Sequence, residues 1–296
     1  MDRPAPKLSS AVPRLFLGLP APAKLNLFLH VVGRRADGYH ELQSVFVPID
    51  LADTLDFESR DDGVIERTGD VIGDVERDLA VRAARLLQAE SATALGVSIH
   101  VDKRIPAGSG MGGGSSDAAT TLIALNRLWN LNWPRERLAA LALRLGADVP
   151  FFLGRGPAFV EGVGERLAPI DWPRTHFAVV HPQVAVSTAE IFADPGLTRR
   201  AKLTTMPAFS AERKAFPRAL FGANDLEPVV RRRVPAVDAA IAHLARYGPA
   251  RMTGSGSAVF VPVESEARAR EALADLPDGW KGWSVQSLQE HPLAPW

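Results

Sequence analysis

Apolar and polar positions alternate near the start of the chain, over the segment LNLFLHVV from residue 25 to residue 32. Leu25, Leu27, Leu29 and Val31 fall on one face of this segment, and the residues between them fall on the other. A period of two is typical of a strand. The pattern therefore predicts β structure at this point.

Further extended structure is predicted after this strand. The pair Asp37-Gly38 is a turn signal, and the segment SVFVPIDLADTLDF (44–57) is rich in the residue types of strands. Residues 1–21 carry an apolar patch that prolines interrupt. We therefore expect a loose N-terminal extension over residues 1–21 and folding that starts near Pro22.

Helical and extended patterns then follow each other. Leu79, Ala83, Leu86 and Leu87 recur at helical spacing, and GVSIHVDK (96–103) predicts a strand. Helices are predicted at 116–129 and 138–145, the second ended by Gly146. After Pro169 the pattern restarts, with strands at 176–181, 257–263 and 283–288 and helices at 237–247 and 265–276. This order predicts an α+β protein with two domains, 22–172 and 173–296, and a long mobile loop at 197–216.

Composition excludes several classes of function. The 34 basic and 34 acidic residues give a formal charge of zero, so no general field would hold nucleic acid or an anionic membrane. The chain has no cysteine for a disulfide or thiol nucleophile, and its seven histidines lack HExxH spacing. No apolar stretch approaches the ~20 residues of a membrane span. We expect a cytoplasmic protein with a small-molecule partner; the sequence leaves the oligomeric state open.

A glycine-rich loop, PAGSGMGGGSS at 106–116, stands between a predicted strand and a predicted helix. Its glycines permit positive φ and let a ligand approach the backbone. The first amides of the following helix have no internal partners, and Ser115 and Ser116 are candidate caps. Free amides and the helix dipole together form a cradle for phosphate. A flexible surface loop would explain the glycines but not their placement directly before a helix.

Two common phosphate motifs can be weighed against this loop. It is not a Walker A loop, because Ser-Ser-Asp follows the last glycine in place of Lys-Ser/Thr. Gly108, Gly110 and Gly113 satisfy the dinucleotide pattern GxGxxG. That pattern needs an acidic residue at the end of a second strand about twenty positions on, whereas NLNWPRE (130–136) leads into a helix. This context disfavours a dehydrogenase. A third possibility is a non-catalytic nucleotide-binding module, which differs from an enzyme in that it needs no catalytic residues.

Several segments together resemble the galactokinase, homoserine, mevalonate and phosphomevalonate (GHMP) kinases. They are PAKLNLFLHVVGRRADGYHELQSV (22–45), PAGSGMGGGSSDAA (106–119), LGADVPFFL (145–153), GVGE (162–165), NDLEP (224–228) and RMTGSGSAVF (251–260). The resemblance implies an N-terminal domain like domain 2 of ribosomal protein S5 and a ferredoxin-like C-terminal domain. It also implies ATP as phosphate donor and Mg²⁺ as its counter-ion, with metal ligands that the sequence does not identify.

The resemblance assigns the loop to ATP. The residues that would contact the nucleotide are Pro106, Ala107, Gly108, Ser109, Gly110, Met111, Gly112, Gly113, Gly114, Ser115 and Ser116. Ala107, Ser109 and Met111 depart slightly from the family's loop and leave its glycine framework intact. Lys103, just before the loop, has two equal interpretations, a charge at a strand end or a nucleotide contact. The second glycine-serine turn, 254–257, would be a hairpin on pattern alone, but in the family it lies close to the loop.

Lys24 and Asp148 are the candidate catalytic residues. Pattern alone would make Lys24 a solvated lysine at a strand end and Asp148 a turn or cap residue. The resemblance instead places Lys24 beside the catalytic aspartate and makes Asp148 the group that accepts or orients the proton of the acceptor hydroxyl. Asn26 would face the same site because residues i and i+2 share a strand face.

The resemblance is strongest to one member of the family, whose acceptor is a cytidyl diphosphate sugar alcohol of the non-mevalonate isoprenoid pathway. It implies transfer of phosphate to a tertiary hydroxyl at C2. Tyr39 and Phe192 would lie on opposite sides of the cytosine, and His40 would bond its edge. Taken alone, Tyr39 could be a partly buried aromatic and His40 a structural histidine. The alternative function is that of another GHMP kinase with a different small alcohol.

Overall fold

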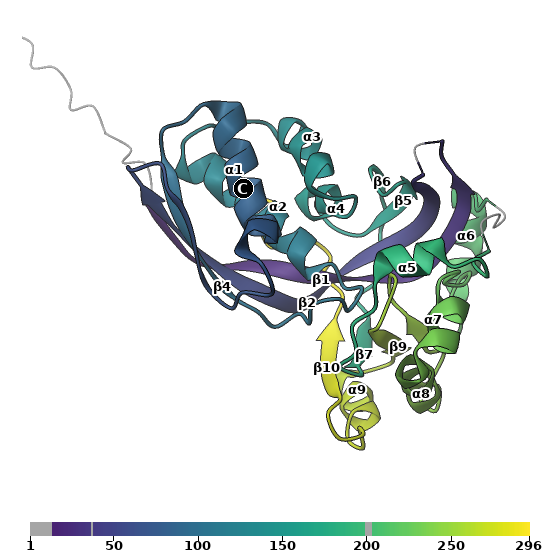
Figure 1. The fold of residues 1–296 in the computed structure, drawn as a ribbon. Coiled ribbons are helices and arrows are strands. Elements are labelled where there is room, and N and C mark those ends of the chain that lie inside the picture. The colour runs from purple at the N-terminus through teal and green to yellow at the C-terminus, as the bar shows by residue number, and fades with distance from the viewer. Residues whose placement is uncertain (1–13, 37, 199–202) are drawn as a thin grey trace, which may run out of the picture.

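The computed structural model describes residues 14–36, 38–198 and 203–296, and in this part the chain forms two sheets with helices packed on them (Figure 1). The larger sheet has the order β3-β4-β2-β5-β6, and β1 pairs with β2. Its strands are β1 (Leu15–Arg34), β2 (His40–Arg60), β3 (Ile65–Gly69), β4 (Gly96–Asp102), β5 (Ala158–Gly162) and β6 (Arg166–Pro169). The smaller sheet, β10-β7-β9-β8, contains β7 (His176–His181), β8 (Arg251–Met252), β9 (Val259–Val263) and β10 (Lys281–Gln286).

Helices cover each sheet separately. Against the larger sheet lie η1 (Val75–Arg77), α1 (Leu79–Ser91), α2 (Gly113–Leu128), α3 (Arg135–Leu145) and α4 (Val149–Leu153). The second part of the chain contains α5 (Thr188–Ala193), α6 (Met206–Glu212), η2 (Arg213–Ala215), α7 (Glu227–Arg233), α8 (Pro235–Leu244) and α9 (Glu266–Ala272). The predicted mixture of strands and helices is confirmed, with boundaries that differ by a few residues. None of the described helices combines the length and apolarity that a membrane span requires.

The first strand begins earlier than expected. It starts at Leu15, whereas the sequence pattern predicted a loose extension up to residue 21. Leu19 and Ala21 are buried, and the ring of Phe16 packs edge-on against Trp296 at 4.9 Å. The prolines that interrupt the apolar pattern are tolerated because, among the strands that the structure describes, β1 pairs with β2 and has no second neighbour.

Beta-bulges change which residues of β1 share a face. The register with β2 shifts between Asn26 and Leu29. As a result, Leu27 and Phe28 belong to one apolar cluster and Leu29 to another. The predicted simple alternation over 25–32 is therefore wrong after Leu27.

The chain returns to the larger sheet after β10. The amide of Leu288 donates to the carbonyl of Pro48 at 2.8 Å, and Leu293 is buried in the core between the larger sheet and its helices. Residues 288–296 therefore pack with the first part of the fold, although the sequence assigned them to the second domain.

The predicted mobile loop contains a helix. Residues 199–202 of that segment lie outside the described part of the chain, but α6 occupies residues 206–212. Phe209 of α6 is 1% exposed and packs among Phe28, Phe159 and Phe221. The short α6 helix carries one large apolar anchor, which was too little periodicity to predict it.

Candidate active site

One edge of β1 contacts both the glycine loop and the turn after β8. The amide of Lys24 donates to the carbonyl of Met111 in the glycine loop, at 2.9 Å. Two residues later the amide of Asn26 donates to the hydroxyl of Thr253, also at 2.9 Å. Both amides are on the edge of β1 away from β2, which none of the described strands occupies. One strand therefore fixes the positions of the glycine loop and of the turn after β8.

The glycine loop and the 254–257 turn pack backbone to backbone. The amides of Ser257 and Ala258 donate to the carbonyls of Gly108 and Ser109, at 3.3 and 3.0 Å. A Cβ on Gly110 would lie 2.3 Å from the carbonyl oxygen of Thr253, so no larger residue fits there. The predicted proximity of the two glycine segments is confirmed.

Helix α2 starts three residues earlier than predicted. Its N-cap is Gly112, which has φ +77°, and no side chain caps it. Ser115 and Ser116 lie inside the first turn, so their predicted capping role is wrong. Gly108 and Gly110 also have positive φ, whereas Gly113 and Gly114 are helical. The first amides of α2 have no side-chain cap, as a phosphate site requires.

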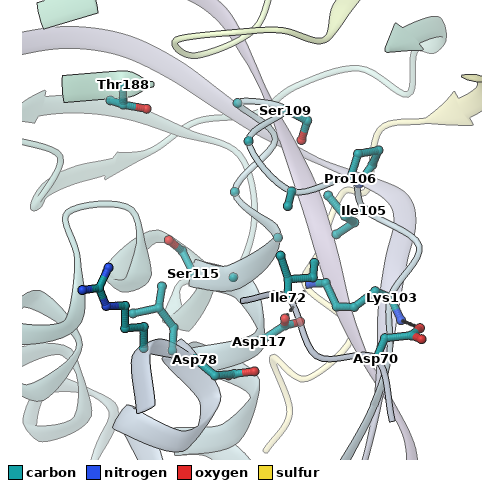
Figure 2. Close-up of a pocket in the computed structure, with 18 of the residues that line it drawn as sticks. Asp70, Ile72, Asp78, Lys103, Ile105, Pro106, Ser109, Ser115, Asp117 and Thr188 are labelled. Carbon is teal, nitrogen blue, oxygen red and sulfur yellow. Dashed lines mark hydrogen bonds and ion pairs between the residues drawn. The ribbon is translucent and has the colours of Figure 1, made fainter. Parts of the chain in front are cut away.

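A cavity of about 480 Å³ opens over this loop and is called the loop cavity (Figure 2). Loop residues 105–110 and 112–115 form one wall, and Ile72 and Thr188 contribute from other segments. Met111 and Ser116, also predicted to contact the nucleotide, are fully buried and do not line the cavity. Its charged lining residues are Arg67, Asp70, Arg77, Asp78, Lys103 and Asp117. The cavity thus brings most of the loop residues predicted to bind ATP to one space.

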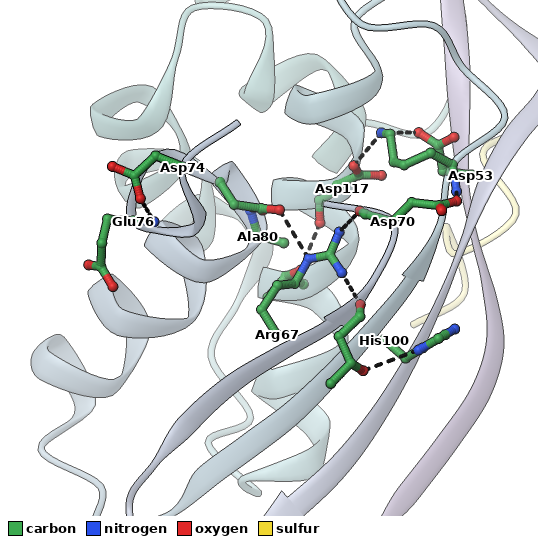
Figure 3. A network of polar contacts seen from close by, with 12 residues as sticks. Asp53, Arg67, Asp70, Asp74, Glu76, Ala80, His100 and Asp117 are labelled. Atoms are coloured by element: carbon green, nitrogen blue, oxygen red, sulfur yellow. Dashed lines mark hydrogen bonds and ion pairs between the residues drawn. The ribbon is translucent and has the colours of Figure 1, made fainter. Parts of the chain in front are cut away.

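Lys103 is held by two buried carboxylates. Its ammonium contacts Asp53 on β2 and lies 2.6 Å from Asp117 in the second turn of α2. Asp53 also accepts the amides of Arg104 and Ile105, at 2.6 and 2.8 Å, and so fixes the turn before the loop. Figure 3 shows Asp53 and Asp117 within the polar network of this region. Lys103 directly follows β4, as one of its two predicted interpretations has it, and its charge is paired with both aspartates. The other interpretation, a nucleotide contact, stays a prediction.

The two aspartates change the ionisation of this cluster. Burial by itself would lower the pKa of Lys103, but Asp117 and Asp53 raise it above the ordinary value. Burial raises the pKa of Asp117 to about 7, against the opposing effect of Lys103. One Asp117 carboxylate oxygen, Oδ1, is buried and has no hydrogen-bond partner among the described residues.

A second cavity, of about 250 Å³, lies on the other side of the glycine loop and is called the lysine cavity. Lys24, Asn26, Asp148 and Phe192 line it. It shares Gly108, Gly110, Gly112 and Thr188 with the loop cavity. The glycine loop is therefore a common wall, with the loop amides on one side and the lysine–aspartate pair on the other.

Lys24 is almost fully buried and lies 3.5 Å from the carboxylate of Asp148. Its ammonium donates to Oδ1 of Asn26 and lies 4.6 Å from the centre of the Phe46 ring. Burial lowers the pKa of Lys24, and Asp148 opposes this shift. Lys24 is thus no solvated residue at a strand end.

Asp148 occupies the N-cap position of α4, yet its side chain caps no amide. The next four residues are all buried, and the rings of Phe151 and Phe152 anchor α4 in the core. A Cβ on Gly112 would meet the Phe152 ring at 3.0 Å and Lys24 at 3.4 Å, so α4 packs directly on the loop. The carboxylate of Asp148 remains available to the lysine cavity.

The three residues predicted at the base pocket are only partly together. His40 stacks on Phe192, with ring centres 4.8 Å apart and planes at 25°. Tyr39 is 63% exposed. Of the three, only Phe192 is among the described residues that line the lysine cavity.

Four contributors to the site were not singled out from the sequence: Asp53, Asp117, Thr188 and Thr253. Asp53 is a polar residue at the centre of a long strand, which is a usable signal because a buried carboxylate needs a partner. Thr253 lies next to the recognised glycine turn, but its contact with Asn26 joins residues 227 positions apart. No local pattern could have predicted that contact.

The sequence matches known families over both parts of the fold. The model of the GHMP kinases N terminal domain matches residues 78–156, and that of the GHMP kinases C terminal matches residues 210–282. The chain therefore belongs to the GHMP kinase family, whose members take phosphate from ATP. Its predicted fold class is confirmed.

Individual relatives narrow the assignment. The 4-diphosphocytidyl-2-C-methyl-D-erythritol kinase of Ralstonia nicotianae is 53% identical over 277 residues, which are 93% of this chain and 95% of that one. The enzyme of that name from Thiobacillus denitrificans is 55% identical over 93% of this chain and 96% of its own. A crystal structure of 4-(cytidine 5'-diphospho)-2C-methyl-D-erythritol kinase superposes with a TM-score of 0.79, at 36% identity over 92% of this chain and 98% of that one. Within the GHMP kinases, the chain groups with these enzymes.

Proposed function

We propose that the chain transfers the γ-phosphate of ATP to the C2 hydroxyl of 4-diphosphocytidyl-2-C-methyl-D-erythritol, in the cytoplasm, as a step of the non-mevalonate isoprenoid pathway. One observation carries the proposal: two cavities share the glycine loop, and the Lys24–Asp148 pair lines only one of them. A donor in the loop cavity and an acceptor in the lysine cavity would meet at this loop. The relatives' names supply the particular acceptor.

The loop cavity suits the triphosphate of ATP. Amides without a side-chain cap at the start of α2 and the positive end of its dipole stabilise phosphate oxygens. Gly108, Gly110 and Gly112 keep side chains away from the wall where the γ-phosphate would face the other cavity. Lys103 adds a positive charge that its two aspartates hold in place.

The lysine cavity supplies the groups for the acceptor. The C2 oxygen forms a bond to the γ-phosphorus, and the bond from that phosphorus to the β–γ bridging oxygen breaks to leave ADP. The hydroxyl proton goes to the carboxylate of Asp148, which also aims the oxygen. Lys24, 3.5 Å from Asp148, offsets the negative charge of the phosphoryl group in transfer.

The donor set around the loop cavity fits Mg²⁺ held largely by the nucleotide. The described residues contain no group of three acidic or histidine side chains that could hold a metal ion. Magnesium in kinases keeps several waters and phosphate oxygens and needs only one or two protein ligands. Ser115 and Asp78, which line the cavity, would supply such oxygens. The bound ion would neutralise phosphate charge during transfer.

Phe192, His40 and Tyr39 would receive the cytidine end of the acceptor. Phe192 lines the lysine cavity, and His40 lies against it as a stack. Exposed Tyr39 follows the turn before β2 and would close over the other face of the base. Stacking on aromatic rings would select a cytidyl group over a bare sugar alcohol.

Release of ADP with a panel of alcohols tests the proposal. The panel contains the cytidyl compound, mevalonate, homoserine and galactose, each with ATP and Mg²⁺. We expect turnover with the cytidyl compound to exceed that with the others by at least about 100-fold, because a site built to bond a substrate group rejects analogues that lack it. Equal or faster turnover of another alcohol would assign the chain to a different acceptor.

A further inference from the structure

A single buried threonine connects the turn after β8 to Lys24. Thr253 is fully buried, and its hydroxyl accepts the amide of Asn26 at 2.9 Å. The same hydroxyl donates to Oδ1 of Asn26 at 3.2 Å. Oδ1 of Asn26 also accepts the ammonium of Lys24. The chain of contacts Thr253–Asn26–Lys24 ends 3.5 Å from Asp148.

The hydrogen bonds fix which way the Asn26 amide points. Ser44 donates its hydroxyl hydrogen to the carbonyl of Phe28, so its oxygen can only accept from Nδ2 of Asn26, at 3.0 Å. The Thr253 hydroxyl oxygen accepts the backbone amide of Asn26, and its hydrogen is donated to Oδ1 of Asn26. A flipped amide would turn two donor hydrogens toward the ammonium of Lys24. Ser44 and Thr253 therefore hold the acceptor oxygen toward Lys24.

The turn that carries Thr253 is itself firmly held. Nδ2 of Asn224 donates to the carbonyls of Met252 and Gly254, on both sides of Thr253, each at 2.8 Å. Arg251, two residues before Thr253, donates to the carbonyls of Leu27, Phe221 and Gly222. These contacts with the second part of the fold therefore fix the position of the Thr253 hydroxyl.

We propose that Thr253 is a positioning residue for phosphoryl transfer, which sets the place of the Lys24 ammonium through the amide of Asn26. The inference rests on the proposed function of Lys24 but not on the identity of the acceptor. Thr253 is not among the described residues that line the loop cavity or the lysine cavity. It therefore acts on the reaction through Asn26. Loss of the Thr253 hydroxyl should lower the rate of the chemical step and leave the affinity for the nucleotide nearly unchanged.

The test replaces Thr253 by valine, which keeps the shape and removes the hydroxyl. Small misplacements of a catalytic group reduce rates by about 10- to 100-fold, and we expect kcat to fall within that range. The KM for ATP should stay within about threefold, because the loop contacts of the turn are made by its backbone. Thr253→Ser should restore at least half of the parental kcat.

A matched control is available in Thr175, another buried threonine, whose hydroxyl donates to the carbonyl of Pro173 away from both cavities. Thr175→Val should keep the parental kcat even if its melting temperature falls as far as that of Thr253→Val, or further. A double-mutant cycle with Asn26→Ala then isolates the relay, because Thr253→Val should have little further effect on kcat once Asn26 is absent. If the valine variant does not fold, Thr253→Ala takes its place in the same cycle.

The assay uses whichever alcohol of the panel the parent phosphorylates, so a wrong acceptor would not affect the result for Thr253. Parental kcat in folded Thr253→Val would overturn the inference. So would an equal loss of kcat in the Asn26→Ala background, or failure of Thr253→Ser to recover activity. A rise in the KM for ATP with kcat unchanged would overturn the inference too, because it would show that Thr253 supports the glycine loop instead.

Discussion

A buried lysine, Lys24, and a partly buried one, Lys103, lie on opposite sides of the glycine loop, and their surroundings differ. Lys103, 13% exposed, contacts two aspartates and has a raised pKa. Lys24, 3% exposed, has one aspartate at 3.5 Å and a neutral amide, and its pKa is lowered. Two carboxylates fix a lysine as a permanent charge, whereas one carboxylate and an amide leave its charge incompletely compensated. The first arrangement holds the loop, and the second is suited to meet a transferred phosphoryl group.

Removal of Lys103 should have the largest effect, and it should fall on stability. Lys103→Met leaves Asp53 and Asp117 buried without their cation, and losing one partner of a buried pair costs about 3–5 kcal/mol. Denaturant unfolding at pH 8 measures the loss. At pH 5 the loss should be smaller, because Asp117, with a pKa raised to about 7, then holds a proton.

Lys24→Met is the matched comparison for that variant. It should lose turnover but keep stability within about 1 kcal/mol, because the remaining Asp148 is 34% exposed and solvated. Equal destabilisation by the two methionine variants would remove the distinction between the lysines.

Asp148→Asn should reduce turnover by at least about 100-fold while ATP binds as before. The reason is that Asp148 lines the lysine cavity and not the loop cavity. Steady-state kinetics and calorimetric titration with a non-hydrolysable ATP analogue give the two quantities. Turnover within threefold of the parent would make Asp148 a structural residue.

Phe192→Ala should weaken binding of the cytidyl compound by about 5- to 150-fold, the equivalent of ~1 to 3 kcal/mol of base stacking. Phe192 lines only the lysine cavity, so the dissociation constant of ATP should hardly change. Tyr39→Ala should act in the same direction. If either variant weakens both ligands equally, the change reports a folding defect.

Asp117→Asn should have the smallest effect, and its sign depends on pH. The folded state holds the Asp117 proton more tightly than the unfolded chain does, because burial raises the pKa from 3.8 to about 7. Stability from this group is therefore complete below about pH 4 and is lost as the pH rises through 7. Asparagine has no such loss, so between pH 5 and 8 the melting temperature of the variant should gain about 2–4 °C on the parent. A difference that does not change with pH would contradict this.

Local patterns were sufficient for much of this fold. The strand at 176–181 was predicted at its observed limits, and the glycine loop was predicted between a strand and a helix, where it lies. These features depend on residues that are neighbours in the sequence. The start of β1 was missed because its burial depends on β2 and on Trp296, at the far end of the chain.

The site was predictable only as far as its motifs reach. Lys24, Asn26 and Asp148 were named in advance, and they line one cavity. The sequence could not decide between the two interpretations of Lys103, because its partner Asp53 lies fifty residues earlier in the sequence. The amides of Lys24 and Asn26 can reach the two glycine segments because they lie on the edge of β1 away from β2, and the sheet order that leaves this edge open has no local signal.

The return of residues 288–296 to the larger sheet also sets an order of events during synthesis. Phe16 and Trp296 pack together, and Arg135 donates to the carbonyls of Leu293 and Trp296. The first sheet therefore cannot complete its packing on the ribosome until these last residues have emerged. Until then the apolar side chains that these residues cover, Phe16 among them, are open to contact with other chains.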